Sequence, residues 1–256
     1  MSELREACVA AAQAGAKVLR DRKDLPRDIH FKGRIDLVTD ADKAAEEAVL
    51  RVLHERFPGV RILAEESGSS GSGDLRFIVD PLDGTTNYAH GLPLYCCTVA
   101  AEVNGVLEAG CTVDPTRDEV FQAGRHEGAT LNGVKLAVSD VTLLERALVC
   151  TGFPYGDREK LPEMIATFGR LTEFARGSRR LGSAALDLAY VAAGRLDAFW
   201  EVGLKPWDVA AGVLLVQEAG GAVTRFDGSE HQLAGGEILA TAPGIHAAML
   251  KKLSPR

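Results

Sequence analysis

The segment DPLDGTTNYAHGLP, residues 80–93, overlaps the end of the strand pattern RFIVD at 76–80 and carries two aspartates close together. Asp80 stands at the end of the strand, and Asp83 lies just before Gly84 in the turn that follows. Two like charges this close repel each other unless a cation offsets them. Strand ends are also where layered α/β folds assemble their sites. The segment therefore predicts a strand that leads into a turn, with a functional site at that turn.

Outward from this segment, helical and strand patterns mix in a way that predicts an α+β or layered α/β fold. Apolar residues recur at helical spacing over 2–21 and 40–57, and 95–114 is a hairpin pattern centred on Asn104-Gly105. Further strands are expected at 60–64, 76–80, 118–124, 146–152, 196–201, 222–226 and 237–243, and further helices at 157–175, 182–194, 207–221 and from 244 onward.

No clear linker divides the chain. We expect one domain over 1–256, with an N-terminal lobe of about 1–145 and a C-terminal lobe of about 146–256. The small-residue stretch SGSSGSGD at 67–74 is interpreted as a flexible loop between two strands.

The composition excludes several classes of protein. With 256 residues, 46% of them hydrophobic, the chain is long enough to bury a sizeable core. No apolar run approaches the roughly 18 residues of a membrane helix, and the N-terminal stretch is interpreted as an amphipathic helix of the mature protein and not as a signal peptide. The net charge of −7 disfavours general binding to nucleic acid or to anionic membranes.

Cysteine and arginine usage adds two expectations. The five cysteines form no CxxC pair and are odd in number, which favours a reduced cytoplasm. The basic cluster Arg176, Arg179 and Arg180 has two interpretations, a solvated surface patch or a contact to an anionic substrate or a partner subunit.

Motifs of several other chemistries are absent from the sequence. It contains no GxSxG elbow, no GxxxxGK[ST] phosphate loop and no GxGxxG after a strand. The six histidines lack HxxxH or HExxH spacing, which argues against a zinc hydrolase. His90, close to the acidic turn, is interpreted as a loop or packing residue.

Carboxylates are the distinctive functional groups. Glu65 and Glu66 follow the strand 60–64, and Asp208 lies in the first turn of the helix 207–221. If these residues meet the aspartates of DPLDGTT, the cluster needs cations, and all-oxygen ligands favour magnesium or manganese.

Each acid also has a structural interpretation. Asp208 could stabilise its helix N-terminus, Asp83 could cap a short helix starting at Gly84, and Glu65 and Glu66 could be solvated loop charges. These separate interpretations do not explain why an acid follows each of two neighbouring strands in the same chain that carries DGTT.

The residues Gly84, Thr85 and Thr86 complement the acids. A glycine allows close approach of the backbone, and the free N–H groups at a short helix N-terminus bind anions. A phosphate held beside metal-binding aspartates fits metal-assisted hydrolysis of a phosphate ester.

The motifs named so far resemble those of the inositol monophosphatase family. The resemblance rests on DPLDGTTNYAHGLP, LAEES and WDVAAG, together with DLVTDAD at 36–42 and RRLGSAALDLAYVAAGRLDAFWE at 179–201. It implies a magnesium-dependent, lithium-sensitive phosphatase with a five-layer α-β-α-β-α fold, usually a homodimer. Two to three Mg²⁺ ions are expected, with Mn²⁺ as a substitute.

The same resemblance implies the ion ligands. Glu65, Asp80 and the backbone carbonyl of Leu82 hold a first ion, and Asp80 bridges to a second that Asp83 and Asp208 also hold. A third, weaker ion is expected near Glu65.

It also implies the groups that act on water and phosphate. Thr85 with Asp42 positions and deprotonates the attacking water, with Glu65 as the competing base, while Gly84 and Thr85 cradle the phosphate. Asp42 also has a structural interpretation, because it lies in the first turn of the helix 40–57.

For the leaving group, the resemblance points to Glu201 as the residue that binds inositol hydroxyls. The implied substrate contacts are Asp83, Gly84, Thr85, Gly182, Ser183, Ala184, Glu201 and Asp208. Lys205 near the pocket would favour a more anionic substrate, which leaves strict inositol specificity open.

The sequence therefore predicts a phosphatase for inositol 1-phosphate or a related small polyol or sugar phosphate. One alternative is a sibling activity on histidinol phosphate, fructose 1,6-bisphosphate or a nucleotide 3′-phosphate. Another is a regulatory or binding protein on the same fold, which contacts the transcription machinery as some bacterial relatives do.

Overall fold

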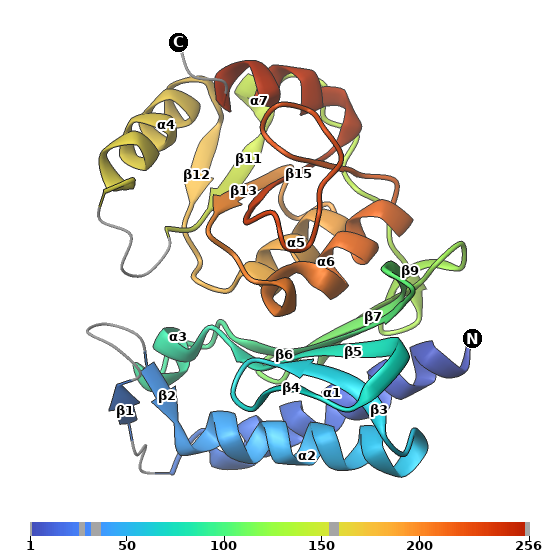
Figure 1. Cartoon of the computed structure of the whole chain (residues 1–256). Helices are drawn as coiled ribbons and strands as arrows, with labels where there is room; N and C mark the ends of the chain where they lie inside the picture. The colour runs from blue at the N-terminus through green and yellow to red at the C-terminus, as the bar shows by residue number, and fades with distance from the viewer. Residues whose placement is uncertain (1, 26–28, 32–36, 154–158, 254–256) are drawn as a thin grey trace.

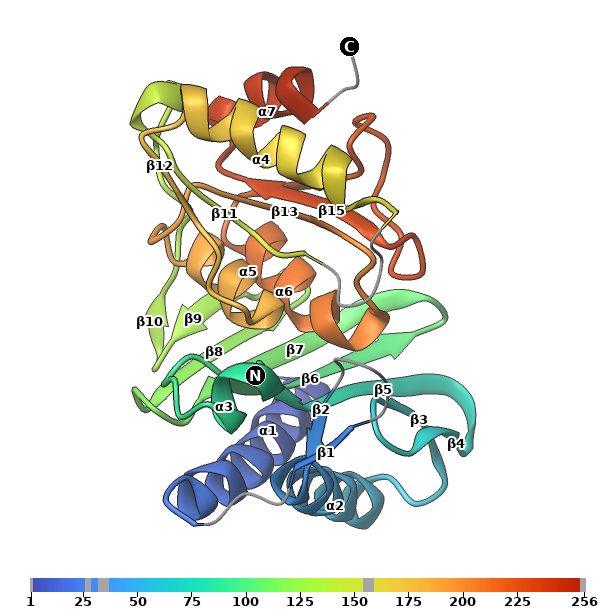
Figure 2. The same ribbon diagram turned by 90° about the vertical axis from the view of Figure 1, so that its left-hand side faces the viewer.

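The computed structural model describes residues 2–25, 29–31, 37–153 and 159–253, and these ranges form five alternating layers of helices and sheets (Figures 1 and 2). Two helices form the first layer, α1 (Glu3–Arg22) and α2 (Asp40–Arg56). The middle layer contains α5 (Ala184–Ala192) and α6 (Pro206–Glu218), and the last contains α4 (Leu161–Phe174) and α7 (His246–Leu253). The two β layers lie between them, so the predicted α-β-α-β-α fold is confirmed.

The first β layer is an eight-stranded sheet, counted over the described residues, in the order β10-β9-β8-β7-β6-β5-β3-β4. Its strands are β3 (Val60–Ala64), β4 (Gly68–Ser70), β5 (Ser72–Asp83), β6 (Cys96–Val103), β7 (Val106–Asp114), β8 (Glu119–Gly124), β9 (Gly128–Leu131) and β10 (Val134–Lys135). Only β3 and β5 pair in parallel among them. The predicted hairpin is confirmed as β6–β7, with positive φ at both turn residues, 51° at Asn104 and 82° at Gly105.

The prediction of a flexible loop at 67–74 is wrong. Most of that stretch belongs to β4 and to the start of β5. Ser70 pairs with Ile62 and Ser72 pairs with Val60, so β3 receives backbone partners on both of its sides. Backbone hydrogen bonds in a sheet do not depend on side-chain size, and for this reason the Ser/Gly composition was a poor guide here.

The second β layer is a five-stranded sheet of the described residues, in the order β12-β11-β13-β15-β14. Its strands are β11 (Leu148–Thr151), β12 (Gly177–Arg179), β13 (Ala198–Val202), β14 (Ala222–Thr224) and β15 (Glu237–Thr241). The strand β12 was not predicted, and α4 begins at Leu161 where the sequence predicted 157. Residues 157 and 158 of that predicted helix lie outside the described residues.

Smaller elements complete the description. β1 (Ile29–Phe31) and β2 (Leu37–Thr39) pair with each other, and α3 (Thr85–Ala89) follows β5. Two 3₁₀ turns, Leu144–Arg146 and Pro243–Ile245, precede β11 and α7. Within the described ranges, no helix combines the length and the hydropathy that a membrane span requires.

Separate apolar cores fill the spaces between the layers. One lies between α1, α2 and the first sheet, another surrounds α5 and α6, and a third lies under α4 and α7. All five cysteines are buried and free, so they pack as small apolar residues. Gly212 of α6 lies directly against Leu188 of α5, so the two helices of the middle layer approach closely.

This close approach gives a test of the middle layer. A Cβ at position 212 would stand 2.5 Å from the Cβ of Leu188, so Gly212→Ala should lower the free energy of unfolding by about 1–3 kcal/mol, despite the better helix propensity of alanine. Gly169→Ala is the matched control, since a Cβ there meets nothing within 4 Å and should raise the free energy of unfolding by about 0.5–1 kcal/mol. Urea denaturation measures both values. Equal effects in the two variants would contradict the packing.

Candidate active site

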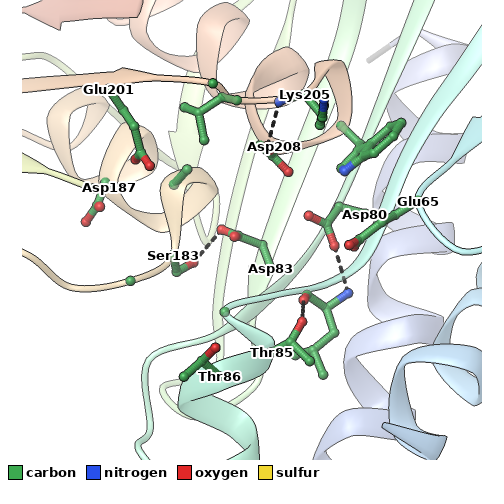
Figure 3. Close-up of a pocket in the computed structure, with 18 of the residues that line it drawn as sticks. Glu65, Asp80, Asp83, Thr85, Thr86, Ser183, Asp187, Glu201, Lys205 and Asp208 are labelled. Carbon is green, nitrogen blue, oxygen red and sulfur yellow. Dashed lines mark hydrogen bonds between the residues drawn. The ribbon is translucent and has the colours of Figure 1, made fainter. Parts of the chain in front are cut away.

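A cavity of about 290 Å³ opens where the first sheet meets the middle helices (Figure 3). Residues from both halves of the chain line it, at the ends of β3, β5 and β13 and at the starts of α3, α5 and α6. Eleven of the twelve predicted site residues line the cavity: Glu65, Asp80, Leu82, Asp83, Gly84, Thr85, Gly182, Ser183, Ala184, Glu201 and Asp208. The exception is Asp42.

An irregularity at the end of β5 turns two aspartates toward this cavity. Residues three positions apart in a regular strand point to opposite faces. Here Asp80 pairs with Thr98 and Asp83 pairs with Cys96, with a shift of register between the two pairs. Because Thr98 and Cys96 are two positions apart, the extra residue on β5 places both aspartates on one face. Asp80 is 2% exposed, and its Oδ1 accepts the backbone N–H of Leu82 at 3.0 Å.

The side chain of Asp83 connects the two halves of the chain. Its Oδ2 accepts the hydroxyl of Ser183 at 2.5 Å and the backbone N–H of Ala185 at 2.7 Å. These groups belong to the N-terminus of α5, so Asp83 caps a helix 100 residues away and not the helix that follows it in sequence. That following helix, α3, starts instead from Gly84, whose φ of 93° favours glycine.

The other two acids reach the cavity from element ends. Asp208 lies in the first turn of α6, and its Oδ2 accepts the backbone N–H of Lys205 at 2.7 Å. It therefore stabilises a helix N-terminus and lines the cavity at the same time. Glu65 follows β3, and the turn after it is held by Glu46, a residue that sequence reasoning missed. The carboxylate of Glu46 accepts the N–H groups of Glu66 and Ser67, each at 2.9 Å.

Burial and mutual repulsion raise the pKa values of these acids. The pKa of Asp80 lies well above its usual range because of burial first and then of the charges of Glu65, Asp83 and Asp208. Burial, with a contribution from Asp83, raises the pKa of Asp208 to about 8. Burial also raises the pKa of Asp83, although its hydrogen bonds at α5 oppose the shift. The ionised cluster is therefore disfavoured unless positive charge enters the cavity.

A divalent cation fits this donor set. The cluster offers carboxylate oxygens and the carbonyl of Leu82, the ligands that Mg²⁺ and Mn²⁺ prefer. In the described ranges, no group of three or more His, Cys, Asp or Glu side chains is already arranged so that it could hold a metal ion. The fit thus rests on the chemistry of the donors and on their buried, repelling charges.

Asp42 lies behind the cavity and contacts it through Thr85. Its Oδ2 accepts the backbone N–H of Thr39 at 2.7 Å and the hydroxyl of Thr39 at 2.6 Å, which forms a capping box at the start of α2. The hydroxyl of Thr85 lies 3.2 Å from Asp42 Oδ1 and 3.0 Å from the carbonyl oxygen of Leu82. Burial raises the pKa of Asp42 to about 6. Asp42 therefore caps the helix with one oxygen and binds Thr85 with the other.

On the opposite side of the cavity, the Glu201 carboxylate lies where a side chain at position 152 would stand. A Cβ built on Gly152 would stand 2.1 Å from Glu201 Oε2 and 2.3 Å from Oε1. Glu201 is 8% exposed, and burial together with the charge of Asp187 raises its pKa well above the usual range.

Several lining residues were missed at the sequence level, among them Gly152, Asp187 and Trp207. Arg180 belongs to the basic cluster for which two interpretations were open, and it borders the cavity, whereas the exposed Arg176 and Arg179 do not line it. The signal for Asp187 was an acid within an otherwise apolar helix. His90 is exposed and does not line the cavity.

Comparisons with known proteins agree with this geometry. The family model described as the inositol monophosphatase family matches residues 1–255. The Nus factor SuhB of Pasteurella multocida is 43% identical over 251 residues, which cover 96% of this chain and 93% of the relative.

Solved structures show the same similarity over the whole fold. The extragenic suppressor protein suhB from Bartonella henselae has a TM-score of 0.95 at 37% identity and covers 99% of both chains. An inositol monophosphatase from Anabaena (Nostoc) has a TM-score of 0.89 at 43% identity and covers 97% of this chain and 94% of its own. A more distant IMPase/NADP phosphatase, solved with Mg²⁺ and phosphate, has a TM-score of 0.82 at 26% identity and covers 94% and 91%.

The contact between Gly152 and Glu201 gives a second test. Gly152→Ala forces the Glu201 carboxylate out of its position, so the free energy of unfolding should fall by about 1–3 kcal/mol. In a Glu201→Ala background the same change should cost much less, because the colliding oxygens are gone. Denaturation of the four proteins of this double-mutant cycle measures the coupling. Additive effects would show that the collision does not set the cost.

Proposed function

The chain belongs to the inositol monophosphatase family, and on that premise we propose that it is a magnesium-dependent phosphomonoesterase for inositol 1-phosphate or a related small polyol or sugar phosphate. The observation that carries the proposal is a single cavity with four carboxylates on one side, the Gly84-Thr85-Thr86 turn at its floor and Glu201 on the other side. Such a cavity has separate places in which cations, a phosphate and a hydroxylated leaving group could bind.

In this proposal the acids hold two to three Mg²⁺ ions, with Mn²⁺ as a substitute. Glu65, Asp80 and the carbonyl of Leu82 would hold one ion, Asp80, Asp83 and Asp208 a second, and a weaker third would lie near Glu65. A related structure contains Mg²⁺ and phosphate, which supports this choice of metal. Bound magnesium would supply Lewis-acid activation of water and of the phosphoryl oxygens.

The chain's own residues would then orient water and move its proton. The hydroxyl of Thr85 would hold the attacking water, and the proton would pass toward Asp42 Oδ1, which lies 3.2 Å from Thr85 Oγ1. Glu65 is the competing base, because it lines the cavity directly. Water would attack phosphorus and the ester P–O bond would break. The leaving alkoxide oxygen would then take up, through solvent water, the proton that the base had accepted.

The remaining contacts would bind the two ends of the substrate. The backbone at Gly84 and Thr85 would cradle the phosphate, next to Asp83 and Asp208. The backbone of Gly182, Ser183 and Ala184 would line the leaving-group side, where Glu201 would accept hydrogen bonds from hydroxyl groups. A carboxylate there disfavours a second phosphate, whereas the nearby Lys205 favours anionic substrates, so a sibling phosphatase activity is the alternative to test.

A second candidate is a regulatory or binding role. It is favoured by the name of a 43% identical relative, a Nus factor. The net charge of −7 argues against general nucleic-acid binding, so such a role would involve a specific partner. A lithium-sensitive, cytoplasmic homodimer stays a prediction from the family and from the five buried free cysteines.

Phosphate release tests the enzyme proposal. We expect turnover of inositol 1-phosphate with Mg²⁺ or Mn²⁺, inhibition by Li⁺, no turnover in EDTA, and a loss of activity in Asp80→Asn and Asp208→Asn. Glu66→Gln is the matched control, since Glu66 neighbours Glu65 in sequence but does not line the cavity. Mg²⁺ should also raise the Tm of the wild type more than that of Asp208→Asn.

Turnover that persists in both aspartate variants would refute the metal assignment. A panel with histidinol phosphate, fructose 1,6-bisphosphate and a nucleotide 3′-phosphate, measured with and without lithium, ranks the sibling activities. No release from any substrate, with the fold intact, would favour the binding role.

The hydroxyl of Thr85 gives a further test. Thr85→Val keeps the shape of the side chain but removes the group that bonds Asp42, so kcat should fall by about 10²–10⁴-fold. Thr85→Ser keeps the hydroxyl and should retain most of the activity. Steady-state kinetics measure both, and equal losses in the two variants would contradict the role of the hydroxyl.

A further inference from the structure

Asp187 is an acid without an evident structural purpose. It is the only charged residue of α5, a helix whose nine residues are all buried. Asp187 itself is 1% exposed, and in the described structure its Oδ1 has no hydrogen-bond partner. An acceptor left unpaired in the interior costs about 1–3 kcal/mol or more, so a purely structural acid would be a poor choice at this position.

The surroundings of Asp187 point to a ligand. Asp187 lines the same cavity as the candidate metal ligands, and Figure 3 shows it beside Glu201, on the side away from Asp80 and Glu65. Asp187 Oδ1 is an unused acceptor there, because it is buried and has no hydrogen-bond partner in the described structure. The Glu201 carboxylate occupies the space that a side chain at position 152 would fill, and it lines the same cavity as Asp187, so two carboxylates face one leaving-group space.

The charge around this pair selects the kind of leaving group. Arg180 lines the cavity and offsets part of the negative charge of both Asp187 and Glu201. A second phosphate would still face two acids, whereas a protonated amine would be attracted by the two acids and repelled by the guanidinium. Neutral hydroxyl groups are donors that suit both acceptors without bringing a charge.

We propose that Asp187 is a substrate-binding residue that accepts a hydroxyl hydrogen bond beside the one accepted by Glu201, so that the preferred leaving group is a neutral polyol with at least two hydroxyls in reach of this pair. This inference rests on the proposed phosphatase function and specifies its substrate class. A site that hydrogen-bonds a hydroxyl discriminates strongly against an alcohol that lacks it, because the buried acceptor is then left unpaired.

The experiment compares two substrates in two variants. Asp187→Leu removes the acceptor with a side chain of similar size, and Asp187→Asn keeps one oxygen. For inositol 1-phosphate we expect kcat/KM to fall about 10- to 100-fold in Asp187→Leu and less in Asp187→Asn. For phenyl phosphate, whose leaving group has no further hydroxyl, we expect changes within about threefold in both.

A matched control separates binding from folding. Asp197→Asn changes an acid that bonds Ser139 and the N–H of Leu148 outside the cavity, and it should lower stability without changing the ratio of the two substrates. Asp187→Leu should be at least as stable as the wild type, since it removes an unpaired buried acceptor. Equal losses on both substrates in Asp187→Leu, or unchanged kinetics on inositol 1-phosphate, would overturn the proposal.

A binding measurement keeps this inference distinct from the phosphatase proposal. Free inositol should raise the Tm of the wild type but not that of Asp187→Leu, and cyclohexanol should raise neither. If the wild type releases no phosphate but shows this pattern, the enzyme proposal fails and the role of Asp187 in binding a polyol stands. If inositol stabilises both proteins equally, the role of Asp187 is refuted whatever the activity.

Discussion

The constraint on which this molecule depends is the repulsion among carboxylates that share one buried cavity. The pKa of Asp80, for example, is raised by burial and by the negative charges of Glu65, Asp83 and Asp208. An interior that only had to be stable would not keep these groups together, because neutral or apolar side chains would avoid the cost. The backbone instead brings them together by an extra residue in β5 and by placing Asp208 in the first turn of α6. The cost of these charges therefore marks the place where a cation would contribute most.

The hydrogen bonds of Asp83 join the acidic cluster to the N-terminus of α5. By accepting hydrogen bonds from Ser183 and Ala185, this aspartate places the N-terminus of α5 against the end of β5. The helix that presents Asp187 is thereby fixed relative to the acids of the first sheet. In the proposed function, three of the four ion-binding acids come from the N-terminal half of the chain and the leaving-group contacts from the C-terminal half, and the Asp83 carboxylate hydrogen-bonds across the two. The positive end of α5 also compensates part of the charge of Asp83.

Periodicity and compact motifs, which are local signals, predicted an α+β or layered α/β fold and the acids of the cavity, whereas the five layers and the leaving-group residues followed from the resemblance to a family. DPLDGTT and WDVAAG carry their acids within a few residues of an element end, where their direction follows from the element. The 67–74 stretch was mispredicted because small residues occur in linkers and in paired strands alike. Gly152 was missed because its role lies in the contact with Glu201, which no local pattern encodes. Asp187 had a local signal, an acid within an apolar helix, but that signal does not show which cavity the acid lines. For Asp42 the helix-capping and the catalytic interpretations are compatible, because Oδ2 accepts the hydrogen bonds of the cap and Oδ1 faces the hydroxyl of Thr85.

The two sides of the cavity differ in what holds their acids in place. Asp83 and Asp208 have backbone N–H partners, so their geometry is set before any ligand enters. On the opposite side, the Glu201 carboxylate fills the space left by the missing side chain of Gly152, and Asp187 keeps an oxygen unpaired. In the proposed phosphatase, the hydrogen bonds of the protein would orient the reacting groups, and the open acceptors would bind the leaving group of the phosphate ester. On that proposal, changes among Gly152, Arg180, Asp187 and Glu201 would alter the choice of substrate and leave the acids of the first sheet in position.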